Sequence, residues 1–443
     1  MLLRVKLGYD RSSGDSTVTR LQVSNEDRDR LAFQLLSLIL GFVGYNHTEP
    51  MESFIINPLA YRILLIDLDI WRKSAPRIQE LYYKQFVTFA VKSKYHEFNS
   101  RRLIRMRIVK RLLDAMKGEV VSEDTISHFM GAFEVLVASN FSQEVMRSLS
   151  LFITYAFHSQ PSSLPRTPRP LSAISRSSTP VPRRRGTPTD PTAAAIASGL
   201  KFLTKKQLGV KVLSMYSRIL CEKGNTTHIK KFARTVTNKW LLYLLAEDDP
   251  EVVVHGCKIL ARLLVTHGSN YTSKFAGKSG GFIIMSNRLK RFWDMPTLWP
   301  ICFSILFGYD VAEINFDRNF DFFSLLETFG KRKVVYPDSL SVITAMLQHG
   351  LKDVMRHQDD PDSPATHIDP SFALKKHASS TELRPRASSM NLATALETRS
   401  NFSRDSERVA SYASVLHTVI RFLSDLHARS TEFRDFALNS EWW

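Results

Sequence analysis

The side chains that could do chemistry in this 443-residue sequence are scattered and form no catalytic pattern. His255 and Cys257 are close in the sequence, but residues two positions apart point to different faces of a helix. Asp67 and Asp69 have the same spacing and the same weakness. We therefore interpret Cys257 as a core thiol and His255 as a surface imidazole. Sequence motifs for nucleotide, metal or acyl chemistry are absent, so we expect no enzyme activity, catalytic residues, metal ligands, cofactor or small-molecule substrate.

The glycine pair Gly280–Gly281 is a second candidate, because adjacent glycines could form an amide nest for an anion. Nearby basic residues are Lys278, Arg288, Lys290 and Arg291. A tight connection between two helices, where glycine is the usual residue, is the favoured interpretation. The apolar residues that follow are expected to form a buried stripe: Phe282, Ile283, Met285, Leu289, Phe292, Trp293, Trp299, Phe303 and Leu306. Truncating Trp293 or Phe303 should therefore lower the melting temperature, whereas truncating Lys290 and Arg291 should not.

Five basic residues are expected on one side of a helix that begins after Asn99 and Ser100 and ends at Gly118. They are Arg101, Arg102, Arg105, Lys110 and Arg111. This face is the best candidate for binding phosphates or lipid headgroups. A solvated helix face is the commoner meaning of such a pattern.

Two polar segments carry candidate phosphorylation sites. Residues 159–192 and 358–406 are rich in Pro, Ser, Thr and Arg, and such compositions cannot bury enough apolar surface to offset the entropy of ordering. We predict that both segments are disordered linkers. Phosphorylation would cancel positive charge within them. The candidates are Thr167, Thr179 and Thr187, each before a proline, and Ser388 and Ser389, which follow arginines as basophilic kinases prefer.

Amphipathic helices must position these residues. Apolar side chains recur at helical spacing through residues 25–158, 193–357 and 407–443. The predicted helices begin at capping residues, prolines or the first apolar position: Asn25, Pro58, Pro76, Asn99, Ser122, Ser142, Thr204, Ile229 and Asp249. The TKKQ sequence at Thr204 is typical of a capping box. Later helices are predicted over 319–329, 339–354 and 408–427.

The periodicity predicts an all-α fold in two helical blocks, residues 25–158 and 193–357, followed by a C-terminal helical segment at 407–443. Helix starts near 204, 228 and 250 are spaced as in paired-helix repeats. Residues 1–24 are polar, and LLRVKL and STVTRLQV within them could be two short strands.

The composition favours an acidic partner and a cytoplasmic location. Sixty Lys and Arg against 43 Asp and Glu give a formal charge of +17, which suits phosphate, nucleic acid, an anionic membrane or an acidic protein. Cys221, Cys257 and Cys302 fit no metal-ligand spacing, so reduced thiols are expected. No signal peptide and no apolar run long enough to span a bilayer is predicted.

Four stretches resemble the fungal beige-like proteins of the BEACH family, in the helical region upstream of the PH-like and BEACH modules. They are EVMRSLSLFITYAFHS (144–159), KKFARTVTNKWLLYLL (230–245), GGFIIMSNRLKRFWDMPTLWPICFSILFG (280–308) and LHTVIRFLSDLHARSTEFRDFALNSEWW (416–443). The resemblance implies an armadillo/HEAT-like α-solenoid within a very large scaffold that acts in vesicle trafficking, vacuolar or lysosomal sorting, or autophagy. PH-BEACH and WD40 sequences do not follow, so we expect a fragment or a split gene model.

Two functions from different classes remain at this point. The first is a non-catalytic scaffold segment that binds protein partners and contacts anionic endomembranes peripherally. The alternative is a basic nucleic-acid-binding protein, although no RRM, KH, zinc-finger or helix-turn-helix pattern supports it. A filter-binding salt titration separates the two, because binding to phosphates weakens steeply with salt.

Overall fold

The computed structural model describes residues 24–66, 68–71, 74–118, 121–158, 202–316, 322–359 and 414–439. Within these ranges the chain is helical apart from short connections. Ser122 and Phe202 form an isolated antiparallel β-bridge. The all-α prediction is therefore confirmed. Residues 1–23, with the predicted strands, lie outside the described ranges, as do residues 159–192 and 360–406 of the predicted linkers.

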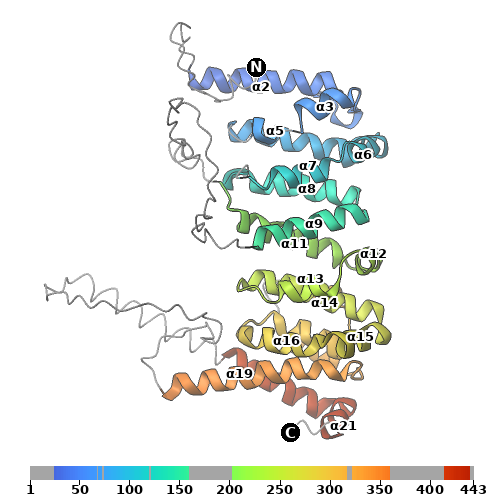
Figure 1. The fold of residues 1–443 in the computed structure, drawn as a ribbon, viewed down its shortest axis with the longest axis vertical. Coiled ribbons are helices and arrows are strands. Elements are labelled where there is room, and N and C mark those ends of the chain that lie inside the picture. The colour runs from blue at the N-terminus through green and yellow to red at the C-terminus, as the bar shows by residue number, and fades with distance from the viewer. Residues whose placement is uncertain are drawn as a thin grey trace, which may run out of the picture. The chain divides into compact units, whose positions relative to one another are not determined.

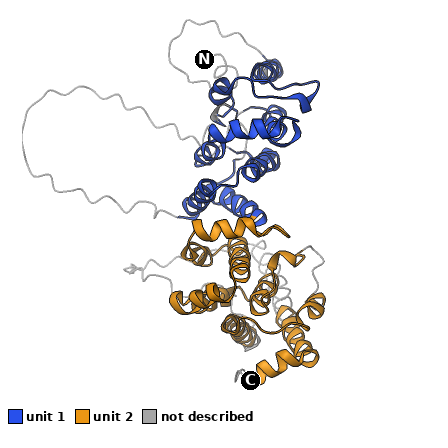
Figure 2. Cartoon of the chain, turned by 90° about the vertical axis from the view of Figure 1, so that its right-hand side faces the viewer, with its two compact units in different colours: residues 1–219 blue, residues 220–443 orange. Residues whose placement is uncertain are grey.

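The chain divides into two compact units, residues 1–219 and 220–443 (Figure 2). The division falls inside the predicted second block, because helix α11 (Lys205–Leu220) belongs almost entirely to unit 1. Gly209 allows α11 to pack closely against the helix that contains Ala156, because a Cβ at position 209 would lie 2.5 Å from the Cβ of Ala156. Arg218 on α11 also pairs with Glu134, with Nη2 2.5 Å from Oε2.

Unit 1 is built of helices that follow one another in successive layers (Figure 1). Before α11 they are α2 (Asn25–Val43), α3 (Pro58–Leu64), α4 (Leu68–Trp71), α5 (Pro76–Val87), α6 (His96–Arg105), α7 (Ile108–Ala115), α8 (Ile126–Ser139) and α9 (Gln143–Phe157). Aromatic rings fill the space between layers: Trp71 stacks on Tyr82 at 5.3 Å between centroids, and Phe129 stacks on Phe133 at 5.8 Å.

Several helix starts follow from local chemistry. Pro58 and Pro76 occupy the first turn of α3 and α5, as predicted. Ser142 caps α9 by accepting from the Val145 backbone N–H, also as predicted. The predicted cap Asn25 is wrong by one position, because Ser24 has the extended backbone and accepts from the Asp27 N–H at 3.1 Å.

The helix predicted to begin after Asn99 differs most from the structure. Helix α6 begins at His96 and ends at Arg105, and α7 restarts at Ile108. Arg107 lies between them with φ of 53°, a left-handed conformation that ends a helix. Asn99 is not a cap; it is buried within α6, where its Oδ1 accepts from the Ile55 N–H at 2.9 Å.

Unit 2 contains the rest of the helices. They are α12 (Thr227–Thr235), α13 (Asn238–Leu244), α14 (Pro250–His267), α15 (Ser269–Ser279), α16 (Gly281–Leu289), α17 (Leu298–Leu306), α18 (Phe322–Phe329), α19 (Leu340–Asp359), a helix over 414–429, and α21 (Thr431–Asn439). The helix predicted from Ile229 to Leu244 is two helices, because Val236 has an extended backbone. Asp249 caps α14 as predicted, and Thr204 and Gln207 form the predicted capping box of α11.

Helix α14 is the centre of unit 2 and packs against α12, α13, α15 and α17. The predicted apolar stripe is largely confirmed, since Phe282, Met285 and Leu289 of α16 are buried, as are Trp293, Trp299, Phe303 and Leu306. Two residues are corrections: Ile283 is 67% exposed, on the outer side of α16, and Phe292 is half-buried. No helix among the described residues has the length and apolar character needed to cross a membrane.

Candidate functional site

The predicted basic face is divided by the break at Arg107. Arg101, Arg102 and Arg105 lie on α6, whereas Lys110 and Arg111 lie on α7. A single continuous face was the wrong prediction, because apolar periodicity does not reveal the left-handed residue that separates the helices. That these five residues form a binding surface remains a prediction.

Two of the five arginine and lysine side chains are structural. The Arg102 Nη1 donates to the Ile55 carbonyl oxygen and lies 3.3 Å from that of Ile56, and its guanidinium carbon lies 4.2 Å from the centre of the Phe98 ring. The Arg111 Nε donates to the Met106 oxygen at 3.2 Å. Arg101, Arg105 and Lys110 are exposed.

The glycine pair is a helix connection. Gly280 has φ of 55°, which favours glycine, and it ends α15 immediately before α16. A Cβ at Gly281 would lie 2.3 Å from the Phe275 ring, so the second glycine permits close packing of the two helices. The structure therefore supports the favoured interpretation of a connector. Arg291 does not join the pair, because its guanidinium is held elsewhere.

Arg291 anchors the connection between α13 and α14. Its Nη2 donates to the carbonyl oxygens of Ala246 at 2.9 Å and Glu247 at 2.5 Å, and its Nη1 lies 2.7 Å from the Asp248 carboxylate. This arrangement argues against the expectation that Arg291 can be truncated without lowering the melting temperature, because one planar guanidinium bonds three successive residues of a loop. Lys290, its neighbour, is half-buried at the end of α16.

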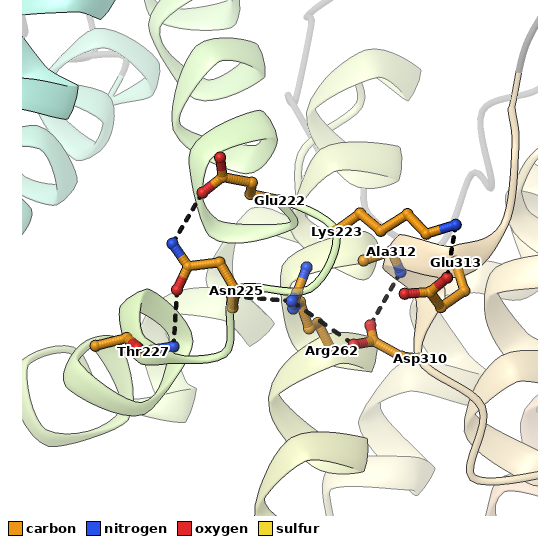
Figure 3. A network of polar contacts seen from close by, with 8 residues as sticks. All are labelled: Glu222, Lys223, Asn225, Thr227, Arg262, Asp310, Ala312 and Glu313. Atoms are coloured by element: carbon orange, nitrogen blue, oxygen red, sulfur yellow. Dashed lines mark hydrogen bonds and ion pairs between the residues drawn. The ribbon is translucent and has the colours of Figure 1, made fainter.

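A second arginine performs the same task at the other end of α14. Arg262 is completely buried, and its Nη2 donates to the Asn225 carbonyl oxygen at 3.0 Å (Figure 3). The same nitrogen lies 3.6 Å from Oδ2 of Asp310, whose other oxygen accepts from the Ala312 N–H at 2.9 Å. Arg262 therefore joins the loop before α12 to the loop after α17 (Figure 3).

Lysines flank this arginine. Lys223 pairs with Glu313 at 2.9 Å across the same two loops (Figure 3). Lys258 lies one helical turn before Arg262, with its Nζ 3.8 Å from the centre of the Phe316 ring. Burial lowers the pKa of Lys258 below its ordinary value, although the ionised Cys221 thiol would oppose that shift. Lys258 and Arg262 are thus two cations one turn apart on α14, and the Asp310 carboxylate pairs with Arg262.

The cysteines are free thiols, as predicted. Cys257 of α14 and Cys302 of α17 are buried. Hydrogen bonding to Cys302 and burial together raise the pKa of Cys257 well above its ordinary value, so this thiol stays protonated. His255 is half-buried rather than a surface imidazole. In the described part of the chain, no group of three or more His, Cys, Asp or Glu residues could hold a metal ion.

The other predicted site residues cannot be placed. The candidate phosphorylation sites Thr167, Thr179, Thr187, Ser388 and Ser389 lie outside the described residues, as does Asp67. They remain predictions.

Sequence reasoning missed the residues that fix the loops. Asn99, Arg262 and Arg291 each bond to backbone groups of another segment. The sequence around Arg262 does contain a sign of its role, because an arginine inside the apolar run of α14 must be buried or paired. Arg291 lies among other basic residues, and nothing in its sequence neighbourhood indicates a structural role.

One comparison with known proteins identifies a region of the chain. Residues 176–355 match the family described as Neurobeachin/BDCP, DUF4704 alpha solenoid region. The match includes α11 to α18 and most of α19. The α-solenoid prediction is confirmed by this match together with the layered helices of the structure.

A second comparison finds a much longer relative. The chain is 27% identical over 324 residues to Beige protein homolog 1 of Schizosaccharomyces pombe (strain 972 / ATCC 24843). The aligned region spans 72% of this chain but 12% of that protein. No solved structure matches the chain.

Proposed function

Because the chain is a segment of a beige-like BEACH-family protein, we propose that it acts as a non-catalytic scaffold on which protein partners assemble. Stacked helix pairs in a solenoid present extended surfaces, and repeat proteins use such surfaces for binding. The partners are recognised by the outer faces of the helices and the loops between them.

The observation that carries this proposal is the use of arginines to hold loops in place. Arg102, Arg262 and Arg291 each donate to backbone carbonyls of a connecting segment. A catalytic site instead needs titratable groups that converge on a pocket where a substrate can bind. Here the charged side chains give the loops fixed positions, which reduces the entropy lost when a partner binds to them.

The cellular process follows from the relationship and belongs to the same proposal. The segment serves vesicle trafficking, vacuolar or lysosomal sorting, or autophagy, on the cytoplasmic side of endomembranes. Phosphorylation of Thr167, Thr179, Thr187, Ser388 or Ser389 regulates partner contacts by adding negative charge. Mass spectrometry of the protein purified from its own cells tests this regulation, and finding all five sites unmodified would reject it.

The scaffold proposal is tested by affinity capture from cytosol with cross-linking. Wild-type protein is compared with Trp293→Ala, which removes a fully buried ring from unit 2 and should destabilise it, and with Lys231→Ala, an exposed substitution on α12. We expect a reproducible set of proteins that Lys231→Ala retains and Trp293→Ala loses. An identical set from both variants would contradict the proposal.

The nucleic-acid alternative has its own test. Filter binding to RNA and DNA is measured at increasing salt. Tight binding with a steep salt slope would favour that alternative, because each released counterion contributes to the slope. Binding that disappears at physiological salt leaves the scaffold proposal in place.

A further inference from the structure

A rigid loop of unit 1 holds apolar side chains out into solvent. The loop is residues 50–57, between α2 and α3 in the sequence, and its segment 53–56 lies beside the end of α2. There the Phe54 N–H donates to Gly44 O and the Ile56 N–H to Val43 O, both at 2.9 Å. Side chains of an extended segment alternate in direction. Ser53 and Ile55 point inward and are fully buried, so Phe54 and Ile56 point outward.

Buried polar groups hold this loop from the other side. Asn99 Nδ2 donates to the Ser53 carbonyl oxygen at 3.2 Å, and Ser93 Oγ donates to the same oxygen at 2.5 Å. The Lys94 N–H donates to the Met51 oxygen at 2.9 Å. The loop is therefore fixed to the start of α6.

The outward side chains protrude. Met51 is 65% exposed and Ile56 is 64% exposed. Phe54 is half-buried because it stacks on Phe98 of α6, with 4.6 Å between ring centroids. The side chains of Met51 and Ile56 thus project into solvent beside the stacked rings of Phe54 and Phe98. Such exposure of apolar residues within basic surroundings marks an interaction surface rather than a core.

Basic side chains lie on α6 and just before it, the part of the chain to which the loop is fixed. Phe98, Arg101 and Arg105 are spaced at i, i+3 and i+7, so they share one face of α6. Residues 91–105 contain five Lys or Arg against one Glu. That acid, Glu97, lies 3.7 Å from Arg101, and Glu52 of the loop lies 2.5 Å from Lys94. Glu49 and Glu52 flank Met51, so residues 49–56 and 91–105 together carry five Lys or Arg against three Glu, a net positive charge.

We propose that this edge of unit 1, formed by Met51, Ile56, Phe98, Lys94, Arg101 and Arg105, binds an anionic membrane surface. Met51 and Ile56 enter the boundary between headgroups and acyl chains, and the basic side chains contact lipid phosphates. The Phe98 ring, 38% exposed, adds to the apolar side of this contact. The surface is called the membrane edge below.

A bilayer suits the membrane edge better than an acidic helix of another protein. A docked helix needs a groove that encloses its apolar side chains, whereas Met51 and Ile56 project outward. A bilayer accepts projecting apolar tips and responds to the charge around them without shape complementarity. The inference specifies the membrane contact of the proposed scaffold, and it does not depend on which proteins the scaffold binds.

Vesicle flotation with the full chain tests the membrane edge. The vesicles are phosphatidylcholine alone or phosphatidylcholine with phosphatidylserine, at low and physiological salt. We expect binding to the phosphatidylserine vesicles alone. Met51→Asp with Ile56→Asp, and separately Arg101→Glu with Arg105→Glu, should each weaken binding by about tenfold or more.

Matched controls lie on other surfaces. Leu151→Asp changes an apolar side chain that is 70% exposed on α9, and Lys231→Glu with Arg234→Glu reverses two exposed charges on α12. Both controls should bind vesicles as the wild type does. Circular dichroism melting establishes that each variant is folded, and the Arg101→Glu and Arg105→Glu pair tests the edge without changing the loop.

A labelled cysteine at Ile56→Cys, in a Cys221→Ser background, reports insertion directly. An environment-sensitive dye at that position should shift to shorter wavelength with phosphatidylserine vesicles. Vesicle binding that both edge variants retain would overturn the proposal, because basic segments elsewhere would then carry it. Binding to polyglutamate without binding to vesicles would also overturn it and favour an acidic protein. Loss of vesicle binding with protein capture unchanged separates this inference from the scaffold function.

Discussion

The indole Nε1 of Trp299 donates a hydrogen bond to the backbone oxygen of Trp293 at 2.8 Å. Both rings are fully buried, and the Trp293 Nε1 in turn donates to Oδ2 of Asp353 on α19 at 2.9 Å. Gly350 leaves room for this contact, because a Cβ there would lie 2.7 Å from the Trp293 ring. The 280–308 segment is therefore a packed joint between α16, α17 and α19.

Truncation of Trp293 should destabilise unit 2 strongly. Trp293→Ala removes a fully buried ring and the hydrogen bond to Asp353, and we expect a loss of about 3–5 kcal/mol in the free energy of unfolding. Trp293→Phe keeps part of the ring and should lose less. Urea unfolding monitored by circular dichroism measures both. Ile283→Ala on the exposed side of α16 is the control and should change stability by about 0.5 kcal/mol or less.

Arg291 should matter as much to stability as a core residue, despite its position in a basic run. Arg291→Ala leaves two loop carbonyls without their donor, and we expect a loss of about 2 kcal/mol. Arg291→Lys should lose most of that stability as well, because an ammonium cannot reproduce the planar fork. Thermal unfolding measures the difference.

The ion pair between Arg291 and Asp248 should contribute less to stability than the hydrogen bonds from Arg291 to the loop carbonyls. Asp248 is 90% exposed at its side chain, so Asp248→Ala should change the free energy of unfolding by about 0.5 kcal/mol. Lys290→Ala should be similarly mild. Equal losses from Asp248→Ala and Arg291→Ala would show that the carbonyl hydrogen bonds contribute nothing.

Capping residues allowed the helix starts to be predicted from the sequence. Ser142, Asp249 and the Thr204 capping box act locally, since the acceptor and the N–H that it bonds are within a few residues. Prolines at 58 and 76 act through their own restricted φ. Such signals need no knowledge of the rest of the fold.

The breaks within helices could not be predicted in this way. Arg107 adopts a left-handed conformation without being glycine, and Val236 is extended although valine carries no breaking signal. In both places the apolar period continues through the break. Packing of the flanking helices decides the conformation there, and that information is not local.

The sequence also could not show which basic residues are anchors. Arg101 and Arg102 are adjacent, yet Arg101 is exposed while Arg102 is tied to the 55–56 carbonyls. The two side chains point in different directions around the helix, and helical periodicity predicts those directions approximately. Periodicity does not predict the contact between Arg102 and the loop at 53–56, because that loop has no periodic pattern and Ile56 lies 46 residues away in the sequence.

Arg262 and Asp310 should respond asymmetrically to substitution. Asp310→Asn retains the side-chain oxygen that accepts from Ala312 but leaves the fully buried Arg262 without a carboxylate. We expect a loss of about 3 kcal/mol, because an uncompensated buried charge is the costly half of such a pair. Arg262→Met removes the charge and keeps the volume, so its loss should be about 1 kcal/mol.

Chemical denaturation of both variants and of the double variant measures this asymmetry. Asp310→Asn should have little effect once Arg262 is Met. If Arg262→Met is the more damaging single change, then the Asn225 hydrogen bond, and not charge compensation, is the main contribution of this arginine.

Lys258 should make the stability of unit 2 depend on pH in a defined direction. Burial lowers the pKa of Lys258 in the folded state, while the unfolded state keeps a value near 10.5. Between those two pKa values the unfolded chain binds more protons, so stability rises with pH across that window. At pH below the folded value the full penalty of burying the charge is present and constant.

Replacement by methionine should remove both the penalty and its pH dependence. We expect Lys258→Met to be at least as stable as the wild type at pH 7, offset only by loss of the contact with the Phe316 ring. The advantage of Lys258→Met should shrink as pH rises toward 10.5. Urea unfolding of both proteins is compared at each pH. The raised pKa values of the buried Tyr61 and Tyr216 affect both proteins equally and cancel in the difference. Lys231→Met, an exposed substitution, should give a flat difference, and a flat difference for Lys258→Met would show that its ammonium is fully hydrated in the folded chain.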